Sequence, residues 1–215
     1  GWSYGSSVTD PRTGEILKGH VSLGSLRIRQ DYLIAQGLYN QPYNKLSVHE
    51  QTMLDMALNR IRQLSAHEIG HTLGFAHNFA ASTNDRASVM DYPHPLVLEG
   101  VGDQFDFSEA YDKGIGDWDK VTVAYAYSDF GDGIDENQAL KEILENAEKA
   151  GLRYLTDSDA RPAGSASATA HLWDNGTDIT EELYRLLDLR AKAISRFSLD
   201  NVPEHSPVAF LEDVF

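Results

Sequence analysis

The sequence predicts an α+β fold, with a strand hairpin at its amino-terminal end, one long helix after it, and a helical carboxy-terminal region. Three observations carry this prediction: a turn sequence between β-type segments near residue 10, apolar residues spaced by three and four from residue 53, and two capped helical patterns after residue 130. We therefore expect residues 1–130 to form one domain and residues 131–215 to form a helical subdomain packed on it.

Composition is that of an ordinary globular protein, with 215 residues of which 41% are apolar and 24% charged. A net charge of −15 argues against nucleic acid and anionic membranes as partners, because both repel an acidic surface. No stretch approaches ~18 consecutive apolar residues, so we expect no membrane insertion. The chain has no cysteine, so any transition metal must be held by histidines and carboxylates.

The segment from Ser6 to Arg29 reads as strands, `SSVTD` and `EILKGHVSLGSLRIRQ`, joined by a turn at `DPRTG`. Pro11 presets one turn residue and Gly14 accepts a positive φ, which is the chemistry of a hairpin. We therefore expect an antiparallel hairpin here.

The long helix is predicted to begin at Ser47, because `SVHE` has the form of a capping box in which Ser47 and Glu50 serve each other's backbone N–H groups. Gly74 is expected to end this helix by taking a left-handed conformation. The apolar residues that set the helical spacing are Met53, Leu54, Ala57, Ile61 and Leu64.

Three further helices are expected downstream. `VTVAY` has strand-like residues, but Asp117 as a cap favours a short helix. A clearer helix runs from about Glu136 to Ala150 with Gly151 after it, and another starts after Asp178, separated by the loop `DARPAGSASATAH`.

Two weaker features bear on metal binding. `DFGDGIDEN`, from Asp129, carries oxygen ligands that could hold Ca²⁺, but its spacing is not that of an EF-hand loop, so a turn and helix cap are favoured. The histidines without partners at ligand spacing are His20, His49, His94, His171 and His205.

Three histidines and a glutamate lie together in `HEIGHTLGFAH`. His67 and His71 are four residues apart, so on a helix they project about 40° apart and both imidazoles can reach one ion. Glu68 points roughly 100° away, which suits a group beside a metal. A chain reversal at Gly74 would bring His77 back as a third imidazole. The segment predicts a zinc site with a fourth position left for water.

Such a site has the parts needed for hydrolysis. A zinc ion lowers the pKa of its water towards ~7 and polarises a carbonyl oxygen. Glu68 beside that water can take its proton and pass it to a leaving amine. A bare `HExxH` also arises by chance on helices, whereas the added Gly74 and His77 make the longer pattern much more specific.

The pattern resembles the extended zinc signature of the metzincin metallopeptidases, whose second hallmark is a methionine turn beneath the metal. The segments `HEIGHTLGFAHNFAAS`, `SVMDYPHP` and `YDKGIGDWDK` are most similar to bacterial zinc-dependent metallopeptidases whose large precursors carry a metzincin-type domain. With `DPRTGEIL` and `LWDNGTD`, the resemblance covers most of the chain. Metzincin domains usually have more sheet and another helix ahead of the edge strand, so it also implies a domain truncated at its amino-terminal end.

The resemblance implies a metzincin-like zincin domain in residues 1–130, with a mixed sheet edge hairpin, a zinc helix and a Met-turn. Its metal ligands would be His67, His71 and His77 around one catalytic Zn²⁺. Glu68 would be the general base, and Met90 would support the zinc site without binding the metal. Asn78 departs from several metzincin subfamilies, which leaves the subfamily open.

The substrate side of the site is also implied by the resemblance. Tyr92, two residues after the methionine, would approach the metal or the oxyanion, with a simple packing role as the alternative. The hairpin strand `ILKGHVSLGS` would pair with extended substrate, or would be covered by the rest of the parent protein. Residues after the methionine would line the pocket beyond the scissile bond. The implied substrate-binding residues are Gly19, His20, Val21 and Pro93.

These features predict a secreted or otherwise extracytoplasmic zinc metalloendopeptidase that acts on peptides or proteins, with the location inferred from the family alone. The alternatives are a catalytically inactive zinc-containing peptide-binding domain and a structural zinc domain closed by a fourth protein ligand. The intact Glu68 favours the enzyme, because a domain without turnover has no need of the base.

Overall fold

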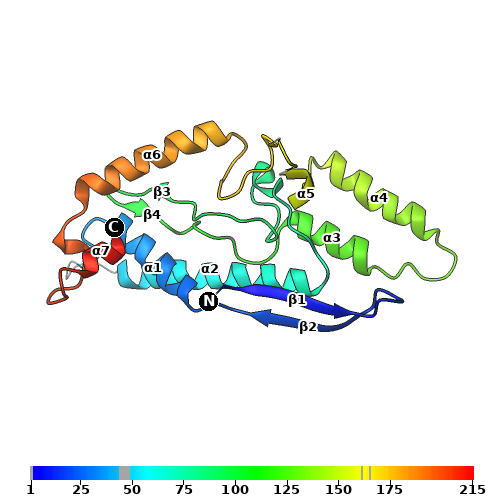
Figure 1. Ribbon diagram of the computed structural model, residues 1–215. Coiled ribbons are helices and arrows are strands. Elements are labelled where there is room, and N and C mark those ends of the chain that lie inside the picture. Colours follow the sequence, from blue (N-terminus) through cyan, green and yellow to red (C-terminus); the bar gives the residue numbers. More distant parts are fainter. Residues whose placement is uncertain (1, 44–48, 161, 165) are drawn as a thin grey trace.

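The computed structural model describes residues 2–43, 49–160, 162–164 and 166–215. Its elements in chain order are β1 Tyr4–Thr9, β2 Ile16–Ser22, α1 Leu26–Leu38, α2 His49–Thr72, η1 Ala81–Asn84, β3 Leu98–Glu99, β4 Phe105–Asp106, α3 Asp117–Tyr127, α4 Glu136–Lys149, α5 Asp157–Ala160, α6 Ile179–Arg196, η2 Leu199–Asn201 and α7 Phe210–Val214. Figure 1 shows an elongated molecule. The β1–β2 hairpin, α1 and α2 run along one long side, α6 lies on the opposite side, and α4 forms one end.

The predicted hairpin is confirmed. Strands β1 and β2 pair antiparallel from Tyr4 opposite Ser22 to Thr9 opposite Ile16, with a bulge at the last pair. Gly14 in the turn has a φ of 78°, as the turn chemistry requires. Both strands contact α2, so the hairpin lies along the helix that carries the first two histidines.

The expectation that the second strand continues to Arg29 is wrong. Strand β2 ends at Ser22 and α1 begins at Leu26. The two-residue alternation of Leu26 and Ile28 resembles a strand, yet Leu26 is 55% exposed. The buried residues of α1 are instead Ala35 and the polar Asp31 and Gln36. This pattern gives only a weak helical signal in the sequence, because a polar residue is buried only where tertiary contacts satisfy its hydrogen bonds.

The long helix α2 is confirmed, and it ends as expected. Gly74 has a φ of 88°, and the Phe75 N–H donates to the Gly70 carbonyl at 3.1 Å, so the chain turns away from the helix axis. Met53, Ala57 and Leu64 are buried as the spacing predicts, whereas Leu54 is exposed. The proposed cap Ser47 lies outside the described residues.

The three downstream helices are present. The cap of α3 is Gly116, not Asp117, which is the first helical residue. Asp135 caps α4 through the Gln138 N–H, which confirms a turn and helix cap where a calcium loop was the alternative. Asp178 caps α6. None of the described helices is long and apolar enough to cross a bilayer.

Two clusters of buried side chains hold these elements together. The larger one joins α1 and α2 to β4 and α6, and its members include Ala35, Met53, Met56, Phe105, Phe107, Leu189 and Ala193. The smaller one lies beside the histidines and joins the loop after α2 to the segment around α5: Phe79, Ala160 and Ala170, with Tyr92, Leu155 and Leu172 packed against them.

Candidate metal centre

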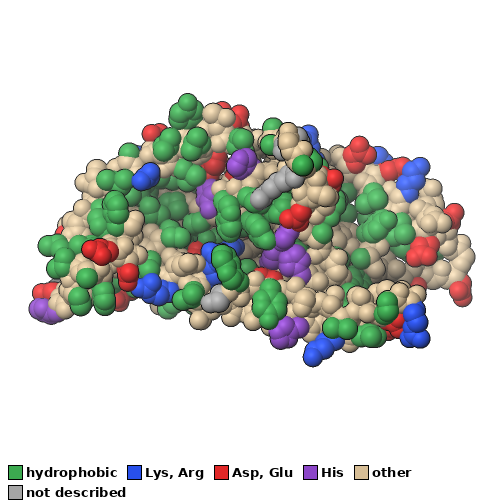
Figure 2. All heavy atoms as spheres, in the orientation of Figure 1, with side chains coloured by type: hydrophobic (Ala, Val, Ile, Leu, Met, Phe, Trp, Pro, Cys, Tyr) green, Lys and Arg blue, Asp and Glu red, His purple; other side chains and the backbone are tan. Residues whose placement is uncertain are grey.

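The three histidines of the predicted site lie together, with one ligand atom from each within 4.8 Å of the others. His67 and His71 come from the last turns of α2, and His77 comes from the loop after Gly74. The Nε2 atoms of His67 and His71 are 3.1 Å apart, near the ~3.3 Å expected between two nitrogens of a tetrahedral zinc site. Figure 2 shows histidine side chains gathered near the middle of this face, between the hairpin and α5.

The rings of the two helical histidines are oriented by backbone carbonyls. His67 Nδ1 lies 2.7 Å from the Val89 oxygen, and His71 Nδ1 lies 2.9 Å from the Phe75 oxygen. Because a carbonyl only accepts, each Nδ1 carries the proton and donates it. Both Nε2 atoms are therefore left with lone pairs for a metal.

The third histidine is oriented by a carboxylate from a distant segment. His77 Nδ1 lies 2.8 Å from the Asp157 carboxylate, which belongs to α5, and its Nε2 lies 2.9 Å from the Tyr92 hydroxyl. A carboxylate behind a histidine fixes the ring and raises the basicity of the opposite nitrogen. Sequence analysis missed Asp157, because no local pattern connects it to a residue 80 positions away.

Burial sets the protonation of the groups on α2. It lowers the pKa of His67 to about 3, although the hydrogen bond to Val89 partly opposes this, so the ring is neutral at physiological pH. Burial also raises the pKa of Glu68, which is 4% exposed, while neighbouring histidines and the Gly5 N–H oppose that shift. A raised carboxyl pKa suits a group that must accept and then release a proton.

Met90 packs against the turn of α2 that carries the ligands. A Cβ added at Gly70 would overlap the Met90 Sδ, and Met90 is 3% exposed. Gly70 lies between His67 and His71, so the thioether contacts the helix directly behind the site. The Met90 carbonyl also accepts the Asn78 N–H at 3.0 Å, which ties this segment to the loop of the third histidine.

Asn78 anchors the same loop from the other side. Its side chain is fully buried, donates to the Arg153 carbonyl at 2.9 Å, and accepts the Leu155 N–H at 3.1 Å. The next residue, Phe79, donates its N–H to the Leu155 carbonyl at 2.8 Å. The residue after the third histidine thus joins the metal loop to the chain that leads into α5.

A cleft of about 310 Å³ opens at the three histidines. Besides the histidines, Glu68 and Tyr92, its walls include residues from the amino-terminal segment, α1, α2 and the loop before α6. These are Ser3, Tyr4, Gly5, Arg27, Arg60 and Trp173. Sequence analysis did not find Arg27, Arg60 or Trp173, because each reaches the cleft only through the tertiary fold.

The structure places the four expected substrate-binding residues, Gly19, His20, Val21 and Pro93, outside the lining of this cleft. Gly5 of β1 lies against the Glu68 backbone, so β1 and not β2 reaches the cleft. Gly19 packs on Thr72 instead. Pro93 lines a separate hollow that also contains Tyr111. A part for these four residues in substrate binding stays a prediction.

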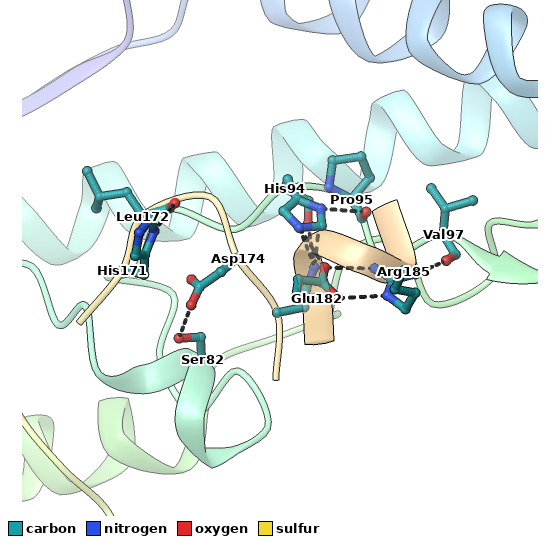
Figure 3. A network of polar contacts seen from close by, with 10 residues as sticks. Ser82, His94, Pro95, Val97, His171, Leu172, Asp174, Glu182 and Arg185 are labelled. Atoms are coloured by element: carbon teal, nitrogen blue, oxygen red, sulfur yellow. Dashed lines mark hydrogen bonds and ion pairs between the residues drawn. The ribbon is translucent and has the colours of Figure 1, made fainter. Parts of the chain in front are cut away.

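A buried carboxylate follows Met90. Asp91 accepts the backbone N–H groups of Tyr92 at 2.7 Å and Ser82 at 3.1 Å, and burial raises its pKa to about 7. The Ser82 hydroxyl donates to Asp174 at 3.2 Å, as Figure 3 shows. These bonds fix the backbone at Tyr92 and link it to the loop before α6.

A second polar cluster attaches α6 to the segment after Asp91 (Figure 3). His94 pairs with Glu182 at 2.8 Å, and Arg185 pairs with Glu182 at 2.7 Å while donating to the Val97 carbonyl. Burial alone would raise the pKa of Glu182, but the hydrogen bonds from Arg185 and His94 outweigh it and lower the pKa to about 2. His94 therefore has a structural partner.

The geometry defines a class of protein: a domain with a three-histidine centre on a helix and its return loop, a glutamate beside it, and a methionine packed behind it. The chain matches the family described as Met-zincin over residues 49–215. It belongs to that family, and the division into domains at residue 130 stays a prediction. No curated protein and no solved structure matches the chain.

Proposed function

We propose that the protein is a zinc-dependent endopeptidase. The observation that carries this proposal is the convergence of three imidazoles, each with its Nδ1 held by an oxygen acceptor, on a cleft that also contains the Glu68 carboxylate. A structural zinc site has no use for a cleft or for a carboxylate at its side.

The donor set fits zinc. Three neutral imidazoles with outer hydrogen bonds are a common ligand set for catalytic zinc, and His67, His71 and His77 would hold the ion through Nε2. When bound, the ion supplies a Lewis acid that polarises the substrate carbonyl and lowers the pKa of water.

The chain's own groups would then handle the protons and the oxyanion. Glu68 accepts a proton from the attacking water and delivers it to the nitrogen of the leaving amine. Tyr92, whose hydroxyl lies 2.9 Å from His77 Nε2, donates a hydrogen bond to the oxygen that becomes negative. Met90 keeps the turn between His67 and His71 in place by packing on it.

The substrate would be an extended peptide or protein segment. The amino-terminal segment through Gly5 lines the cleft beside Glu68 and presents extended backbone there. Extended backbone can bind a substrate main chain without reading much sequence. An extracytoplasmic location belongs to the same proposal and rests on the family resemblance alone.

Cleavage of a mixed peptide library by the zinc-loaded protein tests the proposal. Glu68→Gln should keep zinc yet lower kcat/KM by about 10²–10⁴-fold, because it removes the base and keeps the shape. Glu50→Gln, in the first turn of the same helix, is the matched control and should leave the rate unchanged. Absence of cleavage by the zinc-loaded protein, or full activity of Glu68→Gln, would contradict the proposal.

A further inference from the structure

One wall of the cleft runs from the metal site to an arginine through two stacked aromatic rings. The Tyr92 hydroxyl lies 2.9 Å from His77 Nε2. The Trp173 ring stacks on the Tyr92 ring, with centroids 5.4 Å apart and an interplanar angle of 21°, and the Trp173 backbone N–H donates to the Tyr92 carbonyl at 2.9 Å. The Arg27 guanidinium lies 5.9 Å from the Trp173 ring centroid. Arg27 is therefore fixed at the end of this wall.

Arg27 has no acid in direct contact. Among the residues that the structure describes, it makes no ion pair, and its hydrogen bond is to the Gln30 side chain at 3.3 Å. Asp31 is close enough to interact electrostatically, but it is 3% exposed and its carboxylate accepts the Tyr111 hydroxyl at 2.5 Å. With the Arg27 guanidinium over the Trp173 ring face and no acid among the described residues in contact with it, its N–H groups are available to a carboxylate in the plane of the group.

A second guanidinium lies deeper in the same cleft. Arg60 is 4% exposed, donates to the Gln63 side chain, and lies over the face of the Tyr111 ring at 5.3 Å from its centroid. The carboxylates at or beside the cleft are Glu68, Asp31, which accepts the Tyr111 hydroxyl, and Asp91, which accepts two backbone N–H groups. The cleft therefore presents two guanidiniums in a chain whose net charge is −15.

The spacings along the wall set the distance between the Arg27 guanidinium and the bond that would be cleaved at the histidines. Successive steps of 4.7 Å from His77 to Tyr92, 5.4 Å to Trp173 and 5.9 Å to the Arg27 guanidinium correspond to at most about five residues of extended chain, at ~3.3 Å per residue. A carboxylate at that distance from the scissile bond would meet Arg27 while the peptide bond lies at the histidines.

We propose that Arg27, with Arg60 behind it, forms a carboxylate subsite that selects substrates carrying a carboxylate within about five residues of the scissile bond. This inference rests on the proposed peptidase function. The carboxylate comes from an Asp or Glu side chain or from the free carboxy terminus of a short peptide, and both sources present the same forked acceptor to the guanidinium.

Paired peptides test the subsite. One series has blocked ends and a single Glu moved through the positions around the cleaved bond, with a Gln twin for each member, and a second series compares free with amidated carboxy termini. In one of the two series, we expect the peptide that carries the carboxylate at one position to be cleaved with about 10-fold higher kcat/KM than its uncharged twin. Arg27→Gln should remove this preference and Arg27→Lys should retain part of it. The exposed hairpin residue Arg12 gives the control Arg12→Gln, which should keep it.

Binding provides a readout that does not depend on turnover. Calorimetry with the metal-free protein and the best carboxylate peptide should give about 10-fold tighter binding than with its amide twin, and the difference should shrink in high salt. If no peptide is cleaved but this difference depends on Arg27, the proposed function fails and the subsite stands. Equal binding and equal cleavage of the twins, or a preference that survives Arg27→Gln in a folded variant, would overturn the subsite.

Discussion

The segment from α2 to Tyr92 and the segment from α5 to α6 contribute to the site in different ways. The first supplies the three histidines that could hold a metal, all within the eleven-residue stretch from His67 to His77, together with Glu68. The second supplies Asp157 behind the third ligand and the Trp173 ring on Tyr92. The comparison teaches that short-range spacing brings the three imidazoles together and carbonyls of the same segment orient two of them, whereas a long-range contact orients the third.

This difference leads to separate outcomes for mutations in the two segments. Changes at Glu68 and Tyr92, the groups of the first segment that would act on the substrate, should affect turnover without loss of metal. Changes in the second segment should affect metal affinity or stability, because its residues act through the groups that they hold in place.

After Glu68→Gln, Tyr92→Phe should have the largest effect on turnover. It removes one hydrogen-bond donor to the developing oxyanion, so we expect kcat to fall by about 10²-fold or more with the zinc content unchanged. The measurement is steady-state hydrolysis beside metal analysis. Tyr154→Phe, a half-exposed tyrosine outside the cleft, is the control. Unchanged turnover would show that Tyr92 only packs.

Asp157→Asn should lower zinc affinity about 10- to 100-fold, because an amide orients His77 less well and does not raise the basicity of its Nε2. Competition with a chelator measures this affinity. Asp159→Asn changes the same short helix without a contact to His77 and should bind zinc as the unmodified chain does. If the Asp157→Asn and Asp159→Asn variants bind zinc equally tightly, Asp157 does not orient His77 for metal binding.

Glu182→Gln should reduce stability in a pH-dependent way. The folded-state pKa is about 2 against an ordinary value of 4.5, so the charged group contributes stability above pH 4.5 that is lost as the pH falls towards 2. We expect the variant to be about 1–2 kcal/mol less stable at neutral pH, and the gap to close in acid. Urea unfolding at several pH values checks this, with Glu181→Gln as control. A difference in stability that stays constant with pH would show that the charge of Glu182 does not stabilise the fold.

Gly70→Ala should have the smallest effect. The new methyl group would displace the Met90 thioether at a cost of about 1–3 kcal/mol, while the helix gains up to about 1 kcal/mol from the better helix former. We expect a net loss of about 1 kcal/mol in the free energy of unfolding. Ile69→Ala changes the exposed neighbour and provides the control. A stabilised Gly70→Ala variant would show that Met90 does not press on this turn.

Sequence patterns predicted the features that depend on neighbours in the chain. The four-residue spacing of His67 and His71 and the left-handed Gly74 follow from helix geometry, so the ligand set could be named before the fold was known. The hairpin turn and the caps at Asp135 and Asp178 are equally local.

The remaining features depend on contacts between distant segments. Asp157, Trp173 and Arg27 reach the cleft from separate elements, and nothing in the sequence around each of them marks that position. The first residues of α1, Leu26 to Arg29, read as strand in the sequence, and Asp31 and Gln36 on the buried face conceal the helical pattern. Such polar residues are stable there only with the partners that the fold supplies, Tyr111 and the Asn201 carbonyl.

Metal analysis of the purified protein tests the central claim most directly. The account predicts about one zinc ion per chain, retained in His205→Ala, whose side chain is exposed and distant from the cleft, and lost in a folded His71→Ala variant. An unmodified protein that binds no zinc, or a His71→Ala variant that binds it as tightly as the unmodified chain, would contradict the account.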